Sequence, residues 1–344
     1  MNPRHRRLLI PGLLVALLVV VVIAAVTDRA EAATDGPVAT IADPRISESS
    51  GLAVSARHEG LGYTVNDSGH AAEVFAIDLA TGAVVGVTTV RAQFRDVEAL
   101  ALRDGTLWIG DVGDNDAVRD DLALYAIDEP GRASGTVDAR RNPVRLAGGA
   151  ADVEALLADP DSDALFVVTK SLASAAVLSL DESALDPSRT AVFRPVARDL
   201  PAFVTDGAFS ADGSRVALLS YGWLWTIDPA DWSVVGRQGL PALSQTETVA
   251  FVDRDAVLVG SEGVDSPLYR LDLSPEVVRP EAPETVATGR PTSEPTTDPV
   301  PTPAPVAAEA DAPVMLLGGA GVAGLLALGG LVAWRLRSRS TRSR

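Results

Sequence analysis

Hydrophobic residues between Pro37 and Ser274 come in short runs that are rich in Val, Leu, Ile and aromatic side chains. Gly, Asp or Pro residues bound most of these runs, and helical periodicity is absent from the region. Short apolar runs between turn-forming residues are typical of antiparallel strands. The pattern therefore predicts an all-β region.

One pentapeptide, DVEAL, occurs twice, at Asp96–Leu100 and at Asp152–Leu156. Related segments are SGLA from Ser50, DGAF from Asp206 and ETVA from Glu247. Each copy continues with a turn, a second β-rich run and a third run that ends on an aliphatic residue and Asp, as in EVFAID and ALYAID. In most copies a fourth, more variable run follows. A unit repeated at this spacing is typical of propellers and other repeat folds.

Four strands per copy and five copies predict a five-bladed β-propeller over residues 38–274. A degenerate sixth blade within the long third repeat is the alternative. The fifth copy lacks an obvious fourth strand, whereas Val38–Ile41 precedes the first copy without a partner. We therefore predict that Val38–Ile41 supplies the outer strand of the last blade, because this closes the ring and removes an unpaired edge.

Both ends of the chain carry export and anchoring signals. Residues 1–32 have a basic start, an apolar run and a small-residue cleavage site, which predict a signal peptide; an uncleaved anchor is the alternative. Residues 275–313 are rich in Pro and Thr and predict a disordered stalk. Residues 314–334 predict a transmembrane helix, and the basic residues 335–344 predict a cytoplasmic tail. We expect a single-pass plasma-membrane protein with an extracellular propeller and a cytoplasmic C-terminus.

The net charge of −17 conceals a stronger acidity in the middle of the chain. Without the first 32 and the last 10 residues, 20 basic and 44 acidic residues remain, a difference of −24. Such a surface repels nucleic acid and attracts cations or basic partners. The chain has no cysteine, which excludes disulfides and thiolate chemistry. The expected partners are the membrane and an extracellular protein or small molecule.

Repeated acidic positions predict an axial funnel. If the first strand of each copy is innermost, the first residue of each copy lines the channel; these residues are Ser50, Glu98, Glu154, Asp206 and Glu247. The ends of the second strands add Asp67, Asp111, Lys170, Tyr221 and Glu262. Lys170 is the only lysine in the chain.

Three interpretations of the funnel stay open. The acids accept hydrogen bonds from backbone amides of the next blade, which is a structural role. Alternatively, Glu98, Glu154, Asp206 and Glu247 hold a cation, because converging carboxylates repel one another unless a positive charge lies between them. Calcium is the extracellular ion that oxygen ligands favour. The third interpretation is catalysis by a carboxylate pair with Lys170 as partner.

The densest acidic stretch, GDVGDNDAVRDD, spans residues 110–121. Its Asp111, Asp114, Asn115 and Asp116 make a second candidate metal site. The order of an EF-hand is missing, and Asp, Asn and Gly are also the residues that tight turns favour. The stretch therefore predicts either a turn or a loop cation site.

The segments ISESSGLA, NDSG, DVEALAL, LWIGDVGDN and LVGSEGVDSPLYR resemble a family of uncharacterised secreted actinobacterial propellers with WD40-like repeats. The resemblance covers residues 41–273 and implies the fold, but no reaction. More distantly, the chain is similar to esterase-like phytases and lactonase-type propellers, and this implies calcium on the axis. The commoner form of the motif is DWED. This chain has Val97 and Ala99 instead, so that the shared acids are Asp96 and Glu98.

The sequence thus favours a cell-surface propeller that acts as a binding module for a protein or small ligand, with either Ca²⁺ on the axis or no cofactor. The acids follow the repeat, as structural or binding residues do, and no histidine or activated serine is in place as a base or nucleophile. The alternative is a calcium-dependent hydrolase of phosphoesters, lactones or glycosides. A purely structural envelope component is the third candidate.

Overall fold

The computed structural model describes residues 36–273, which lie in the first of two units of the chain, Met1–Ala282. The predicted signal peptide, stalk, membrane span and tail lie outside the described residues. Among residues 36–273, no helix has the length and apolar character needed to span a membrane. One short 3-10 helix, η1 (Glu182–Ala184), is surrounded by strands and loops, so the all-β prediction is confirmed.

The described strands form antiparallel groups of four, numbered here from group 1 to group 5. Group 1 contains β2 (Ser49–Val54), β3 (Leu61–Asn66), β4 (Glu73–Asp78) and β5 (Val84–Arg91). Group 2 contains β6 (Val97–Arg103), β7 (Thr106–Asp111), β8 (Ala123–Asp128) and β10 (Arg140–Leu146). Group 3 contains β11 (Val153–Ala158), β12 (Ala164–Thr169), β13 (Ala175–Asp181) and β14 (Ala191–Leu200). Group 4 contains β15 (Val204–Phe209), β16 (Val216–Ser220), β17 (Trp223–Asp228) and β18 (Ser233–Gly239).

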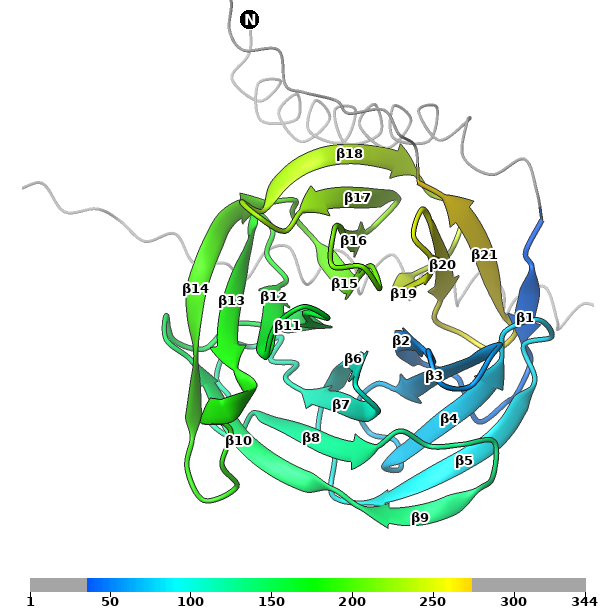
Figure 1. Cartoon of the computed structure of the whole chain (residues 1–344), viewed down its shortest axis with the longest axis horizontal. Coiled ribbons are helices and arrows are strands. Elements are labelled where there is room, and N and C mark those ends of the chain that lie inside the picture. Colours follow the sequence, from blue (N-terminus) through cyan, green and yellow to red (C-terminus); the bar gives the residue numbers. More distant parts are fainter. Residues whose placement is uncertain (1–35, 274–344) are drawn as a thin grey trace, which may run out of the picture. The chain divides into compact units, whose positions relative to one another are not determined.

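Group 5 closes the ring with a strand from the beginning of the described region. It contains β19 (Thr246–Asp253), β20 (Ala256–Ser261), β21 (Ser266–Asp272) and β1 (Ala39–Ile41). β1 pairs antiparallel with β21, in a register that places Ala39 opposite Leu268. The predicted outer strand is therefore confirmed, and Figure 1 shows the groups around a common axis with the first strand of each group nearest the centre. This arrangement is a β-propeller-like fold.

Two parallel pairings on the outside of the ring link neighbouring groups. β10 pairs with β14, which joins groups 2 and 3 into an eight-stranded sheet. β9 (Gly135–Asp138) leaves group 2 and pairs with β5 of group 1. The repeat pattern contains no signal for either link, because both use variable outer segments.

Apolar side chains from neighbouring groups pack against one another between the sheets. Trp108 of β7 is fully buried in a cluster that includes Leu165 and Phe193 of group 3. Tyr63 of β3 lies in a second cluster with Ile109 of β7. Because both faces of the middle strands are covered, strands such as β20 are buried throughout and read as continuous apolar runs.

The closing strand generates a prediction about stability. Ile41 is 1% exposed and packs with Phe75, Ile77 and Leu268. Because the substitution removes a buried side chain, Ile41→Ala should lower the free energy of unfolding by about 2–5 kcal/mol in urea denaturation. Val38→Ala is the matched control, since Val38 is 48% exposed beside the same strand, and it should change the value by less than about 0.5 kcal/mol. Equal losses in both variants would contradict the role of β1 in closure.

Candidate functional site

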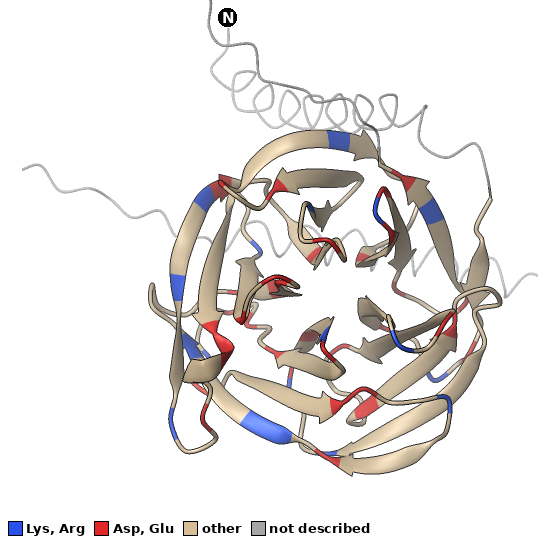
Figure 2. Cartoon of the chain, in the orientation of Figure 1, with Lys and Arg blue, Asp and Glu red and all other residues tan. Residues whose placement is uncertain are grey.

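The innermost strands of all groups begin at the same end of the ring, and the second strands end there. The contacts between groups fix this alignment, since the Ser50 hydroxyl donates to the Glu98 carbonyl oxygen at 2.9 Å and the Val249 amide donates to Asp206 Oδ2 at 2.7 Å. We call this end of the ring the mouth. Figure 2 shows negative residues on strands near the centre and positive residues on several outer strands.

Every innermost strand carries a β-bulge close to the mouth. The pairing with the second strand skips one residue in each group: Gly51, Glu98, Glu154, Thr205 and Glu247. A bulge bends the strand and re-aims a side chain. Three glutamates from groups 2, 3 and 5 are therefore presented at equivalent positions of the ring.

This register corrects the repeat alignment in two copies. The sequence pattern places Ser50 and Asp206 at the position of Glu98, but in the structure Gly51 and Thr205 occupy the bulge. The error is one residue in each copy. It arises because a bulge adds a residue that the apolar pattern does not record.

Each of the three bulge glutamates is buried and has a different partner. The exposed fractions of Glu98, Glu154 and Glu247 are 6%, 2% and 5%. The Ser50 hydroxyl lies 3.3 Å from Glu98 Oε2. Lys170 Nζ donates to Glu154 Oε1 at 2.8 Å, and the Tyr221 hydroxyl lies 3.5 Å from Glu247 Oε1. The equivalent positions are thus chemically distinct.

Lys170 is the positive centre of one side of the mouth. Burial would lower its pKa, but the adjacent Glu154 carboxylate reverses the effect, so that the pKa of Lys170 lies above its ordinary value. Its ammonium also lies 5.7 Å from the centre of the Tyr221 ring, a cation–π distance. Burial raises the pKa of Glu154, and Lys170 opposes that shift.

Asp206 has a structural role. It is fully buried, and its two oxygens accept hydrogen bonds from the backbone amides of Gly207 and Val249, each at 2.7 Å. Val249 belongs to the next group, as the structural interpretation predicts for the repeated acids. Burial raises the pKa of Asp206, and the backbone amides act against this. These bonds use both carboxylate oxygens.

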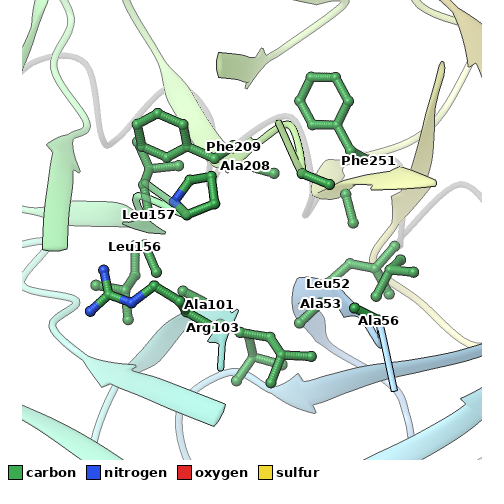
Figure 3. Close-up of a pocket in the computed structure, with 18 of the residues that line it drawn as sticks. Leu52, Ala53, Ala56, Ala101, Arg103, Leu156, Leu157, Ala208, Phe209 and Phe251 are labelled. Atoms are coloured by element: carbon green, nitrogen blue, oxygen red, sulfur yellow. The ribbon is translucent and has the colours of Figure 1, made fainter. Parts of the chain in front are cut away.

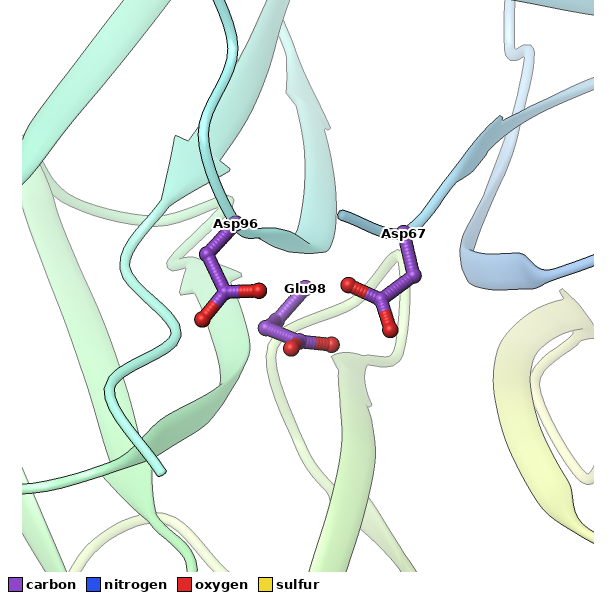
Figure 4. A group of neighbouring side chains, drawn as sticks. All are labelled: Asp67, Asp96 and Glu98. Carbon is purple, nitrogen blue, oxygen red and sulfur yellow. The ribbon is translucent and has the colours of Figure 1, made fainter. Parts of the chain in front are cut away.

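A cluster of three carboxylates lies at the mouth where groups 1 and 2 meet. Asp67, Asp96 and Glu98 each place one oxygen within 4.8 Å of the others, and Figure 4 shows the three side chains pointing toward one another. Burial and the charges of Glu154, Asp67 and Asp96 raise the pKa of Glu98, and the charge of Lys170 acts against them. Burial and the Asp67 carboxylate raise the pKa of Asp96 to about 6. We call this group the carboxylate cluster.

A glycine makes room for the carboxylate cluster. A Cβ atom at Gly113 would lie 2.6 Å from Asp96 Oδ2 and 2.8 Å from Glu98 Cγ. Any other residue at position 113 would therefore displace both acids. This close approach requires glycine at position 113, the second glycine of GDVGDN.

The acidic loop from Asp111 to Asp121 supports the cluster. Asp111 accepts hydrogen bonds from the Asp96 amide at 3.0 Å and from Arg119 Nη2 at 2.8 Å. Asp114 accepts from the amides of Val118 and Arg119 at 2.9 and 2.8 Å. These contacts favour the turn interpretation, since they engage the carboxylates that the predicted loop cation site would need. The remaining predicted ligands, Asn115 and Asp116, are exposed.

The structure therefore divides the predicted site residues. Of the four acids predicted to share one cation, only Glu98 belongs to the carboxylate cluster, and Asp67 joins it from the predicted funnel. Glu262 lies at the rim, accepts from Gln245 Nε2 at 2.6 Å and has its pKa raised by burial and by Asp67. Asp96 was not among the predicted ligands, although its place at the start of DVEAL was the available signal.

The Asp of the second DVEAL copy, Asp152, has another role. Asp152 Oδ1 accepts a hydrogen bond from the Asp114 amide at 2.9 Å and so ties group 3 to the loop of group 2. Asp96 faces Asp67 of group 1 instead. The repeated DVEAL thus gives one Asp at each of two junctions between groups.

The opposite end of the axis is mainly apolar, with Arg103 and Asp104 as its charged lining residues. A cavity of about 270 Å³ is lined there by residues of all the innermost strands, among them Leu52, Leu100, Leu157, Phe209 and Phe251 (Figure 3). The two ends of the channel therefore differ in chemistry. The three buried bulge glutamates lie at the mouth.

Comparisons with known proteins add no family. No family model matches the chain, and no curated protein matches it, so the resemblance to the actinobacterial propellers stays a prediction. Among solved structures, the chain is similar to Kuenenia stuttgartiensis hydrazine synthase, with 16% identity, a TM-score of 0.37 and coverage of 63% of this chain and 56% of that one. It is also similar to a chain of a nidogen/laminin complex, with 15% identity, a TM-score of 0.40 and coverage of 65% and 76%. The chain thus spans little more than half of the first of these.

The buried glutamates generate a prediction about pH. Burial raises the pKa of Glu247 from 4.5 to about 9. The folded chain then holds a proton that the unfolded chain releases, so this contribution to stability is full below about pH 4.5 and is lost as the pH rises toward 9. In urea denaturation between these pH values, Glu247→Gln should make the decline shallower, by at most about 1.4 kcal/mol per pH unit.

Glu59→Gln is the control for this experiment, since Glu59 is exposed in the loop between β2 and β3, away from the mouth. Its free energy of unfolding should change with pH by the same amount as that of the unmodified chain. If the free energy of unfolding of Glu247→Gln also changes with pH as in the unmodified chain, the raised pKa of Glu247 is contradicted.

Proposed function

We propose that the chain is a five-bladed β-propeller, with each group as one blade, that serves as a binding module at the outer surface of the cell. Its ligand binds at the mouth, and the carboxylate cluster takes up a cation there. The signal-like start, the stalk and the apolar C-terminal segment of the sequence support the location. The extracellular location in turn supports calcium as the ion.

The convergence of Asp67, Asp96 and Glu98 carries this proposal. Among the described ion pairs, Lys170 neutralises Glu154 and Arg119 neutralises Asp111, whereas none involves a member of the cluster. Mutual repulsion and burial disfavour three charges at this spacing, and a bound cation would relieve both. Carboxylate oxygens suit Ca²⁺, which takes six to eight oxygen ligands, so that three acids would leave positions for water or a ligand.

A calcium-dependent hydrolase is the second candidate. The observation that favours it is the pKa of Asp96, which at about 6 is in the range where a carboxylate works as a general base. The binding module is favoured because Asp206 is bonded to backbone amides and Glu154 is paired with Lys170. Release of product from aryl phosphates, lactones or aryl glycosides in the presence of calcium, lost in Asp96→Asn, would decide for the hydrolase.

The cation proposal predicts a change in thermal stability. Calcium should raise the melting temperature of the detergent-solubilised full chain, because an ion that binds only the folded state stabilises it by about 2.7 kcal/mol at 100 times its Kd. EDTA should reverse the shift. In Glu98→Gln the shift should be absent, since the substitution removes a charged ligand of the cluster.

Glu154→Gln is the matched control, because it replaces an equally buried bulge glutamate outside the carboxylate cluster. This variant should retain the calcium shift even if its own melting temperature falls. An unmodified chain that melts at the same temperature in EDTA and in calcium would refute the cation site.

A further inference from the structure

Large exposed apolar side chains gather at the mouth. Five of the seven in the described part of the chain lie on its loops: Val118, Leu172, Phe203, Tyr221 and Val264. The other two, Val38 and Val196, lie beside β1 and on β14. Neither a carboxylate site for a bare ion nor a channel for water requires such a rim. Exposed apolar side chains that gather on one face are typical of surfaces that bind macromolecules.

Three of these side chains come from adjacent loops of groups 3 and 4, and we call them the apolar shelf: Leu172, Phe203 and Tyr221. The rings of Phe203 and Tyr221 lie 6.2 Å apart, and the Phe203 amide donates to the Ser171 carbonyl oxygen at 2.9 Å. Leu172 follows Ser171 directly and is 70% exposed. The shelf therefore borders Lys170, whose ammonium lies over the Tyr221 ring.

The backbone of Phe203 is held in an unfavourable conformation. Its φ is +58°, in the left-handed region that glycine and asparagine adopt far more readily than a large side chain does. Nevertheless a phenylalanine occupies the position, with 39% of its surface exposed. Strain of this kind gathers at functional sites, and here it presents an aromatic ring on the face of the mouth.

Acidic residues surround the apolar ones. In the β7–β8 loop the exposed Val118 lies between Asp116 and Asp120, and in the β20–β21 loop Val264 lies between Glu262 and Asp265. None of these four acids takes part in an ion pair of the described residues. The basic residues of the mouth loops do take part in such pairs, namely Arg45, Arg95, Arg119 and Lys170. The unpaired charge of the β7–β8 and β20–β21 loops is therefore negative.

A groove leads away from the shelf. It measures about 490 Å³ and runs between the β7–β8 loop, residues 148–152 and the β12–β13 loop. Its polar walls carry both charges, from Asp114 and Asp152 on the one hand and from Lys170 and Arg198 on the other, and Leu146 and Leu178 contribute apolar lining. An open channel of this kind suits an extended chain that has both polar and apolar groups.

We propose that the mouth docks an extended basic segment of a partner protein. An aliphatic or aromatic side chain of the segment packs on the apolar shelf, and its lysine or arginine side chains face the unpaired acids of the rim. The inference deepens the proposed binding function and rests on it. It assigns the rim and the groove to a polypeptide, whereas the cation is assigned to the carboxylate cluster.

The test is selection of displayed random linear peptides on the purified full chain in detergent, in calcium and in EDTA. Enriched peptides should carry lysine or arginine next to a large apolar residue, and the affinity of a synthetic copy should fall as salt is added. Leu172→Asn and Phe203→Asn should weaken binding of this peptide about tenfold or more, since each removes a contact of the shelf. Phe203→Asn suits the left-handed backbone, and a preserved melting temperature would show that its fold is intact.

Val196→Asn is the matched control, because Val196 is 49% exposed but lies on the outer strand β14, and the peptide should bind it as tightly as the unmodified chain. Enrichment of acidic peptides, no enrichment, or equal affinity for the shelf variants and the control would overturn the docking proposal. A calcium-induced melting shift in the same preparation would then leave the cation site standing. Peptide binding without any calcium shift would refute the cation site alone.

Discussion

The β-bulge in each innermost strand is the constraint on which the chemistry of this molecule depends. A ring of sheets brings the innermost strands together at the axis, and the bulge turns one extra residue per strand toward that crowded space. Three of those residues are glutamates, so folding buries three carboxylates at equivalent positions. Buried charges need a partner, a proton or an ion. The partner that each group of strands supplies to its buried acid therefore determines the role of that acid.

The groups that compensate the buried carboxylates differ from one group of strands to the next. These differences separate acids that are bonded or neutralised within the fold from acids that are not. Asp206 and Asp114 accept backbone amides, and Lys170 neutralises Glu154. Among the described residues, Glu98 has a serine hydroxyl as its side-chain hydrogen-bond partner and feels the charge of Lys170, and it faces two further carboxylates. The loop that presents Asp96 is held by Asp111, so the positions of the acids in the cluster are set by residues that are themselves satisfied. The contrast between these satisfied supports and the repelling charges of the carboxylate cluster supports the proposed cation site.

The sequence predicted the fold better than the site, for a physical reason. Strand boundaries follow from apolar runs and from the Asp that ends each third strand, and those signals are local. The pairing register is not local, and the bulges shifted Ser50 and Asp206 by one residue from their assigned places. The cluster likewise depends on Asp67 and Asp96 meeting across two blades, and on a missing Cβ at Gly113. The parallel pairing of β9 with β5 was equally hidden, because it uses a segment outside the repeat.

The two ends of the axis carry different residues, and this difference supports the mouth as the proposed binding site. At the far end the same strands line the cavity mainly with leucine, alanine and phenylalanine, and Arg103 and Asp104 are the charged exceptions. At the mouth the repeat breaks down, since Lys170, Tyr221 and Phe203 occur in single blades and each has a distinct contact. A ring needs only its repeated residues in order to close. Phe203 combines a left-handed backbone with an exposed aromatic ring, and closure of the ring gives no reason for that combination at the mouth.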